Sequence, residues 1–258
     1  MSDKYYIASC SCGKDSLAMV LRLINEGKPL NEILFYDTGM EFNAIYRNWD
    51  RLRRIAEEKG IKCTLLTPKC KFAWTMVEKP VNVGKPNEHR GYAWCGGRCR
   101  WGTTEKLEAL DKYCEELNAF CYVGIAADEE ERLCKEHKEY KLYPLESWGM
   151  TEVDCLAYCR ENGWSWEEYT DKTESKSIDL YDILDRVSCY CCGNKNLWEL
   201  RNIWYYLPKY WNSLCALQWI IPRPFKKNLT VFELGDKFKN GYMPKHIIRR
   251  KKYEQKRS

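Results

Sequence analysis

Several features are missing from this sequence, and each absence excludes a class of protein. No run of 18 apolar residues occurs, so we expect no membrane span. The first residues, MSDKYYIAS, contain no basic segment followed by an apolar stretch, so no secretion signal is expected. Internal repeats and low-complexity linkers are also absent. We therefore expect a cytoplasmic chain whose 258 residues are enough to bury a substantial core.

Histidine is scarce and cysteine is abundant. The chain has 3 histidines, and His89 and His137 lie in polar stretches without the spacing of metal ligands. Its 15 cysteines, in a cytosolic chain of this size, indicate metal or redox chemistry rather than a disulfide framework. Isolated cysteines at helical spacing among apolar residues are expected to be small core residues. These are Cys114, Cys155, Cys159 and Cys215.

The positive charge is concentrated at one end of the chain. The net charge is +5, and the final segment KHIIRRKKYEQKRS, residues 245–258, is strongly basic, whereas the rest of the chain is close to neutral. A basic terminal segment can contact the phosphate backbone of a nucleic acid, or it can simply be solvated. Both interpretations stay open.

Strand and helix patterns alternate along the first two thirds of the chain. Short apolar runs over residues 4–9, 32–39, 61–68, 119–126 and 141–145 predict buried strands, and helical patterns over 16–27, 42–60 and 151–163 lie between or after them. Thr151 and Asp154 have the spacing of a helix capping box. The alternation predicts an α/β fold, an open parallel sheet with helices on both faces, whose ligand site lies beyond the carboxyl ends of the strands.

From Cys189 onward the pattern changes to aromatic-rich helix over residues 197–220, and then to a loop and the basic end. We therefore expect two domains, an α/β domain over residues 1–187 and a cysteine-containing helical extension over residues 188–258. The tryptophans and tyrosines between Trp198 and Trp219 recur at helical spacing, which predicts core packing rather than a surface for stacking bases.

The stretch SCSCGKDS, residues 9–16, joins the first predicted strand to the first predicted helix. A helix N-terminus presents backbone N–H groups and the positive end of the helix dipole, which favour an anion. Gly13 permits a close backbone approach, Lys14 supplies a charge, and Ser11 and Ser16 supply hydroxyls. It is not a Walker A loop, because Gly13-Lys14 is followed by Asp15 rather than by Ser or Thr.

This stretch resembles the S-G-G-K-D-S pyrophosphate loop of the adenine-nucleotide alpha hydrolase-like superfamily, and within it the phosphoadenosine-phosphosulfate reductase family. YDTGMEF, VGIAADEEERL and YPLESWGMTEVDCLAYCRENG resemble three later segments of that family, in the family's order. Together the four segments cover residues 5–163. In the segment VGIAADEEERL, Ala126 stands where the family has Arg, and Arg132 falls one residue before the position of the family's closing Arg.

The resemblance implies an open Rossmann-related fold that binds ATP or a related adenine nucleotide with Mg²⁺, so that attack falls between the α and β phosphates. Asp37 would contact magnesium or the ribose, and Lys14, Asp15 and Asp37 would be the catalytic residues. The residues that the resemblance assigns to the nucleotide are Ser9, Ser11, Gly13, Lys14, Asp15, Ser16, Asp37, Thr38, Gly39, Gly124 and Arg132.

Two clusters of cysteines are separated by about ninety residues. Cys189 and Cys192 have the C-x-x-C spacing with which a turn directs two thiolates at one metal centre. With Cys95 and Cys99 they make four ligands, and the set resembles the one that holds a [4Fe-4S] cluster in the adenylyl-sulfate reductase and DNA-phosphorothioation branches. Zn²⁺ satisfies the same donors, and unliganded or redox-active thiols are a third interpretation. The adjacent Cys191 leaves open which residue of the second pair is the ligand.

The carboxyl end separates three functional hypotheses. Family members that reduce phosphoadenylyl sulfate carry a C-terminal E-C-G-x-H segment, and this chain has no cysteine after Cys215. The first hypothesis is an enzyme that cleaves ATP to activate an acceptor for sulfur transfer to a nucleic acid, with a sulfur-donor or electron-donor protein as partner. The second is a reductase of adenylyl sulfate or phosphoadenylyl sulfate. The third is a non-catalytic nucleotide or cluster sensor that binds DNA through its basic end.

Overall fold

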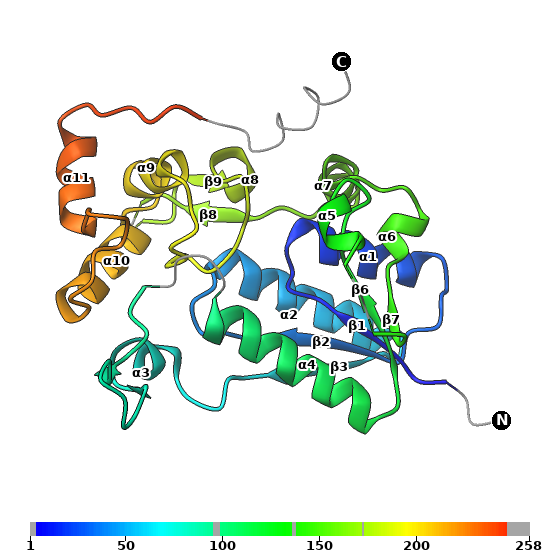
Figure 1. The fold of residues 1–258 in the computed structure, drawn as a ribbon. Coiled ribbons are helices and arrows are strands. Elements are labelled where there is room, and N and C mark those ends of the chain that lie inside the picture. Colours follow the sequence, from blue (N-terminus) through cyan, green and yellow to red (C-terminus); the bar gives the residue numbers. More distant parts are fainter. Residues whose placement is uncertain (1–3, 95–98, 136–137, 172, 247–258) are drawn as a thin grey trace, which may run out of the picture. The chain divides into compact units, whose positions relative to one another are not determined.

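The computed structural model describes residues 4–94, 99–135, 138–171 and 173–246. The chain divides into two compact units, each formed from two separate segments (Figure 1). Unit 1 contains Met1–Phe72 and Arg98–Trp166, and unit 2 contains Ala73–Gly97 and Glu167–Ser258. Within the described ranges, no helix combines the length and apolar character needed to cross a membrane.

Unit 1 is built on a parallel sheet with the strand order β3-β2-β1-β6-β7. Ala8 in the central strand pairs with Ile33 on one side and with Tyr122 on the other. The strands are β1 (Tyr6–Ser9), β2 (Glu32–Tyr36), β3 (Lys62–Leu66), β6 (Phe120–Val123) and β7 (Lys141–Leu142). The predicted α/β fold with an open parallel sheet is confirmed.

Helices cover both faces of this sheet (Figure 1). On one face α4 (Glu105–Glu116) packs over a buried cluster that includes Ile7 and Leu34. On the other face Trp49 of α2 (Asn43–Glu58) contacts the ring of Phe35, which points away from Leu34 because successive side chains of a strand alternate. The remaining helices of unit 1 are α1 (Lys14–Asn25), α5 (Glu130–Leu133), α6 (Pro144–Ser147) and α7 (Glu152–Glu161), and a π-helical turn, η1 (Arg100–Thr104), precedes α4.

The predicted capping box of α7 is confirmed, since the Thr151 hydroxyl accepts from the Asp154 N–H and the Asp154 carboxylate accepts from the Thr151 N–H. Cys155 and Cys159 of this helix are fully buried, and so is Cys114 of α4, as expected for small core residues. Cys215 is half-buried. Helix α7 packs beside α1, which brings the segment after residue 150 to the first βα junction.

A buried carboxylate lies at the start of β2. Glu32 accepts hydrogen bonds from the hydroxyls of Tyr5 (3.0 Å), Tyr113 (2.8 Å) and Thr64, and its Oε1 lies 3.1 Å from Lys62 Nζ. Its side chain is fully buried. The donors lie in the residue before β1, in β3 and in α4. This one side chain of β2 therefore connects β2 to β3, to α4 and to the start of β1.

Unit 2 has two small antiparallel ribbons and a group of helices (Figure 1). Its elements are α3 (Phe72–Val77), β4 (Pro80–Val81), β5 (His89–Arg90), β8 (Glu167–Tyr169), β9 (Ser177–Asp179), α8 (Leu180–Ile183), α9 (Leu197–Tyr206), α10 (Pro208–Ile220) and α11 (Val231–Lys239). The expected boundary between residues 187 and 188 falls inside this unit, and the division into folding domains stays a prediction.

The aromatic stretch of unit 2 differs from its expectation in two respects. The single helical pattern over 197–220 is two helices, because Pro208 cannot continue α9 and instead begins α10. Tyr210 and Trp211 are core residues, but 81% of Trp219 and 58% of Tyr205 are exposed, so the expected core packing is wrong for these two residues. The Trp219 ring of α10 packs against Phe232 of α11, with 5.2 Å between the ring centroids.

The described chain ends against unit 2. The ring of His246 stacks on that of Trp198, with 3.8 Å between the ring centroids. The His246 Nε2 lies 2.7 Å from Asp185 Oδ1. Most of the basic segment follows this point, outside the described residues.

Candidate functional site

The loop after β1 has the features of an anion site. Helix α1 begins at Lys14, and its N-cap, Gly13, contributes no side-chain hydrogen bond to the first turn. Such a helix end leaves its N–H groups to be satisfied by other partners, which is the condition for binding an anion. The loop follows β1, the central strand of a parallel sheet. It therefore lies at the carboxyl ends of the strands, where α/β folds bind their ligands.

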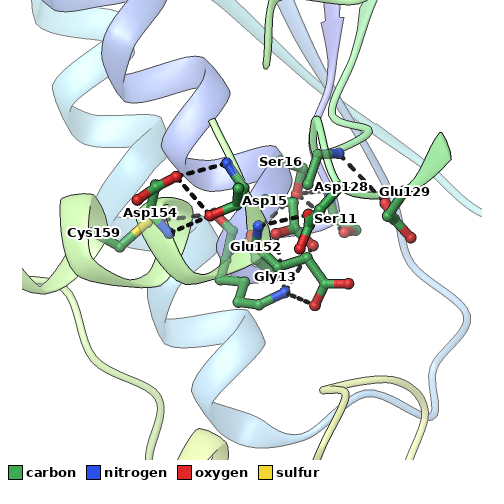
Figure 2. Close-up of polar contacts among 12 residues, drawn as sticks. Ser11, Gly13, Asp15, Ser16, Asp128, Glu129, Glu152, Asp154 and Cys159 are labelled. Atoms are coloured by element: carbon green, nitrogen blue, oxygen red, sulfur yellow. Dashed lines mark hydrogen bonds and ion pairs between the residues drawn. The ribbon is translucent and has the colours of Figure 1, made fainter. Parts of the chain in front are cut away.

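Ser16 gives the loop its compact shape (Figure 2). Its Oγ accepts from the Ser11 N–H at 3.1 Å, lies 3.1 Å from the Ser11 Oγ, and donates to the Gly13 carbonyl at 3.2 Å. The turn places Cys12 at a φ of 55°, and the buried indole N–H of Trp166 donates to the Cys12 carbonyl at 2.7 Å. Ser11 and Ser16, two of the three serines predicted to bind phosphate, are therefore brought together.

Lys14 is buried between two carboxylates. Its Nζ lies 2.9 Å from Asp15 Oδ1 and 2.7 Å from Glu152 Oε2 of α7. Burial alone would lower the pKa of Lys14, but the charges of Asp15 and Glu152 outweigh it and raise the pKa. Burial raises the pKa of Asp15 to about 6, against the opposing effect of Lys14. The sequence predicted Lys14 and Asp15 but missed Glu152.

Glu152 belongs to an acidic group that surrounds the loop (Figure 2). Its backbone N–H donates to Asp128 Oδ1 at 2.9 Å, which fixes the start of α7 against the segment after β6. Arg132 donates to both oxygens of Glu129, at 2.8 and 2.6 Å. The predicted nucleotide residue Arg132 is thus engaged by Glu129. Glu152 follows the predicted cap Thr151, and this first-turn position was the available signal.

Gly124 lies where β6 meets the first turn of α1. A Cβ added to it would stand 2.8 Å from the Ser16 Cα, closer than real Cβ atoms approach other atoms, and 3.0 Å from the Ser16 N. The absence of a side chain therefore permits the close contact between the end of β6 and the loop.

The turn after β2 contains Asp37, Thr38 and Gly39. Asp37 Oδ1 accepts from the Gly39 N–H and from the Tyr46 hydroxyl, each at 2.7 Å. Burial, followed by this bond to Asp37, raises the pKa of Tyr46 above its usual range. Thr38 donates to Glu41 at 3.0 Å. Because β1, β2 and β6 are parallel neighbours, the predicted residues that follow these three strands all lie at the carboxyl ends of the strands.

The predicted cysteine ligands that the structure describes are divided between the two units. Cys99 is in unit 1, where its Sγ accepts from the Gly102 N–H at 3.1 Å. Cys189 and Cys192 are in unit 2, in a turn closed by the Cys192 N–H to the Cys189 carbonyl at 3.1 Å. Cys95 lies outside the described residues. Among the residues that are described, no three His, Cys, Asp or Glu side chains are grouped to hold a metal ion. The four-thiolate site stays a prediction.

Within unit 2, two features connect the residue before Cys95 with the second cysteine cluster. The Trp94 ring packs edge-on against Phe225 at 4.6 Å. The next residue, Lys226, donates its Nζ to the carbonyls of Gly193 (2.6 Å) and Lys195. Trp94 Nε1 is buried and has no hydrogen-bond partner within the described part of the chain. This buried donor is compatible with an acceptor, such as a sulfur atom, beside it.

The model of the phosphoadenosine phosphosulfate reductase domain matches residues 5–192. This chain belongs to that family. The match confirms the resemblance drawn from the loop and the three later segments, and it extends through the second cysteine cluster.

Two individual proteins are also similar to this family member. An uncharacterized protein of Methanocaldococcus jannaschii is 28% identical over 224 residues, which cover 81% of this chain and 40% of that protein. The chain therefore spans well under half the length of this relative. The solved structure of the U34-tRNA thiolase NcsA from Methanococcus maripaludis, with its [4Fe-4S] cluster, aligns with 92% of this chain and 71% of the thiolase, at 15% identity and a TM-score of 0.43.

Proposed function

We propose that this chain is an enzyme that binds ATP at the loop of residues 9–16 and cleaves it between the α and β phosphates to activate an acceptor. The observation that carries the proposal is the loop itself. An α-helix N-terminus without a side-chain cap, two serine hydroxyls and a buried lysine meet at the carboxyl edge of a parallel sheet. Family membership over residues 5–192 supports the same ligand class.

Each residue of the loop has a distinct proposed role. Ser11 and Ser16 donate to phosphate oxygens, and Lys14 exchanges one of its carboxylate partners for the phosphates. Asp15 and Glu152 hold the lysine in position while the site has no nucleotide. The carboxylate group of Asp37 suits Mg²⁺, which prefers oxygen ligands and neutralises phosphate charge when bound with the nucleotide.

The proposed reaction is a displacement at the α phosphorus. An acceptor oxygen attacks that phosphorus, the bond to the oxygen bridging the α and β phosphates breaks, and pyrophosphate leaves with the electron pair. Negative charge develops on the leaving pyrophosphate, where Lys14 and the α1 N-terminus stabilise it. The adenylated acceptor is then ready for displacement by a sulfur nucleophile.

We further propose that the acceptor is a nucleic acid and that a separate protein supplies the sulfur. The basic composition of residues 245–258 supports this choice. The test is pyrophosphate release from ATP by the full chain, with and without bulk tRNA or DNA. Release stimulated by nucleic acid and lost in Lys14→Ala supports the proposal. ATP binding without any pyrophosphate release under either condition contradicts it and favours a nucleotide sensor.

A second candidate function is reduction of adenylyl sulfate or phosphoadenylyl sulfate, which the family match favours. Its test is sulfite release from either substrate in the presence of a thioredoxin system. Sulfite release at a rate that exceeds pyrophosphate release from ATP would replace the first proposal.

The thiols of Cys95, Cys99, Cys189 and Cys192 are proposed to hold a [4Fe-4S] cluster, with Zn²⁺ as the alternative ion. Two observations support the fit, the Gly102 N–H directed at Cys99 Sγ and the buried, unpartnered N–H of Trp94 within the described residues. Such a cluster supplies an electron-transfer centre when bound. Absorbance at about 400 nm after anaerobic purification identifies the cluster, whereas a colourless, zinc-loaded protein identifies the alternative.

A further inference from the structure

Two cysteines of the nucleotide loop have no part in the function proposed above. Cys10 and Cys12 flank Ser11, and their sulfur atoms lie 3.9 Å apart. Both side chains are buried, with 1% and 0% exposed. A pair of thiols in contact inside a proposed phosphate-binding loop is a candidate modification site.

The backbone of the loop makes this contact. Cys12 has a φ of 55°, in the left-handed region. The indole N–H of Trp166 donates a hydrogen bond to the Cys12 carbonyl at 2.7 Å. Residues two apart in a chain lie within or near the Cα separations that disulfides span, about 4.4–6.8 Å. Bonding these two sulfurs therefore requires side-chain rotation and a local adjustment of the turn, without movement of other elements.

The two thiols are chemically unequal. A hydrogen bond from Cys12 lowers the pKa of Cys10 against the opposing effect of burial, whereas burial raises the pKa of Cys12. The charge of Lys106, at the start of α4, lowers both pKa values, and Glu41 raises that of Cys12. Cys10 is therefore the thiol with more thiolate character and the expected nucleophile of the pair.

We propose that Cys10 and Cys12 form a reversible disulfide when a hydroperoxide reaches the loop, and that this disulfide prevents nucleotide binding. Ser11, between the two buried thiols in the sequence, is exposed to solvent. A small oxidant at this surface is therefore one residue away from each thiol along the chain. The effect on the nucleotide rests on the function proposed above, whereas disulfide formation does not.

The oxidation is balanced with hydrogen peroxide as the oxidant. The Cys10 thiolate attacks one peroxide oxygen, the O–O bond breaks, and a sulfenic acid forms as hydroxide leaves. The hydroxide takes up the proton that the Cys10 thiol had released and becomes the first water. The Cys12 sulfur then attacks the sulfenic sulfur, the S–S bond forms, and the second water leaves with the Cys12 proton. The two thiols lose two electrons, and the peroxide is reduced to two waters.

The disulfide would change the part of the loop that contacts phosphate. Ser11 lies inside the ring that the bond closes, and both its N–H and its hydroxyl contact Ser16 Oγ at 3.1 Å. Turning the cysteine side chains toward each other pulls Ser11 away from Ser16. We expect the affinity for ATP to fall by at least about tenfold, the loss expected when charge-assisted hydrogen bonds are removed.

The experiment treats the reduced full chain with hydrogen peroxide, with and without ATP, and then analyses its peptides by mass. The expected product is a Cys10–Cys12 peptide lighter by two hydrogens, restored by a thiol reductant and formed more slowly when ATP is bound. Irreversible acids alone, a different partner for Cys10, or an unchanged peptide would overturn the site.

Two variants keep the test independent of folding. Cys12→Gly suits the left-handed φ, and Cys10→Ala removes the nucleophile. Each is expected to bind ATP when reduced and to keep that affinity after peroxide, while Cys134→Ala, at an exposed cysteine, is expected to lose affinity as the unmodified chain does.

The two proposals fail in different ways. If the disulfide forms but ATP affinity is unchanged, the regulatory inference is wrong. If the reduced chain does not bind ATP at all, the proposed function is wrong, and the mass measurement alone decides whether the disulfide site stands.

Discussion

At the scale of single residues, Lys14 is the centre of the candidate site. It is buried, and it reaches carboxylates from its own helix and from α7. A cation held between acids has two consequences. It stays in place without a ligand, and it gains a phosphate partner only by giving up a carboxylate. We therefore expect the affinity for nucleotide to depend on the carboxylates as well as on the lysine.

Lys14→Ala is expected to weaken ATP binding by at least about tenfold, because it removes the charge-assisted hydrogen bonds to phosphate. Isothermal titration calorimetry measures the affinity. Lys28→Ala is the matched control, since Lys28 is exposed and forms a surface pair with Glu26. An unchanged affinity in Lys14→Ala would show that the nucleotide does not bind at this loop.

The pKa of Asp15, raised to about 6 by burial, predicts pH-dependent binding. Below this pH the carboxyl group is neutral, and above it a negative charge stands beside the phosphates. The affinity is therefore expected to fall as the pH rises from about 5 to about 7. ATP titrates in the same range, so Asp15→Asn, measured across the same pH values, reports the ligand's own contribution. Equal slopes in both proteins would contradict the prediction.

At the scale of elements, the end of β6 and the start of α1 must approach closely. The Cβ that Gly124→Ala introduces would stand 2.8 Å from the Ser16 Cα. We expect the loop to shift, the melting temperature to fall and ATP affinity to decrease. Gly235→Ala is the control, because a Cβ there meets Trp211 at 3.5 Å, an ordinary contact. Calorimetry of both variants provides the measurements, and a Gly124→Ala protein as stable as the control would refute the packing role.

The buried Glu32 cluster joins β2, β3 and α4. Glu32→Gln is expected to lower the free energy of unfolding at pH 7 by about 2 kcal/mol, because charge-assisted hydrogen bonds are weakened. Burial would raise the pKa of Glu32, but the bonds from Thr64, Tyr113 and Lys62 outweigh it and lower the pKa.

The sign of the pH effect follows from this lowered pKa. The stabilisation is present above the unfolded value of about 4.3 and is lost as the pH falls through the folded pKa. Urea unfolding at pH 7 and pH 3 is expected to show a smaller difference between Glu32→Gln and the unmodified chain at pH 3. Glu26→Gln, at an exposed pair with Arg22, is the control. A constant difference at both pH values would count against the charge of Glu32.

At the scale of the whole molecule, the chain folds as two units, each assembled from two segments. The predicted metal ligands come from two cysteine clusters about ninety residues apart in the sequence, so the metal content is measured on the full chain. Cys192→Ser is expected to lose most of the iron or zinc found by elemental analysis after anaerobic purification. Cys134→Ser, at an exposed cysteine outside both clusters, is expected to keep it. Full metal content in Cys192→Ser leaves Cys191 as the ligand to examine.

Local sequence patterns were sufficient for much of unit 1. Runs of apolar residues gave the strands, and Thr151 with Asp154 gave the start of α7, because both depend on neighbours within a few residues. The helical pattern over residues 197–220 missed the break at Pro208, although proline is itself a local signal. Periodicity also failed for Trp219, since a spacing does not reveal whether a helix face is covered.

The sequence by itself determined the family, the parallel α/β fold and the loop with Lys14, Asp15 and its serines, because these rest on residue types at short spacing. Only the tertiary structure decided that Glu152, 138 residues away, would pair with Lys14, and that Gly124 would lie against Ser16. It also decided that Trp166 would hold the Cys12 carbonyl. Contacts between distant segments depend on how helices and strands pack, and no local pattern encodes that packing.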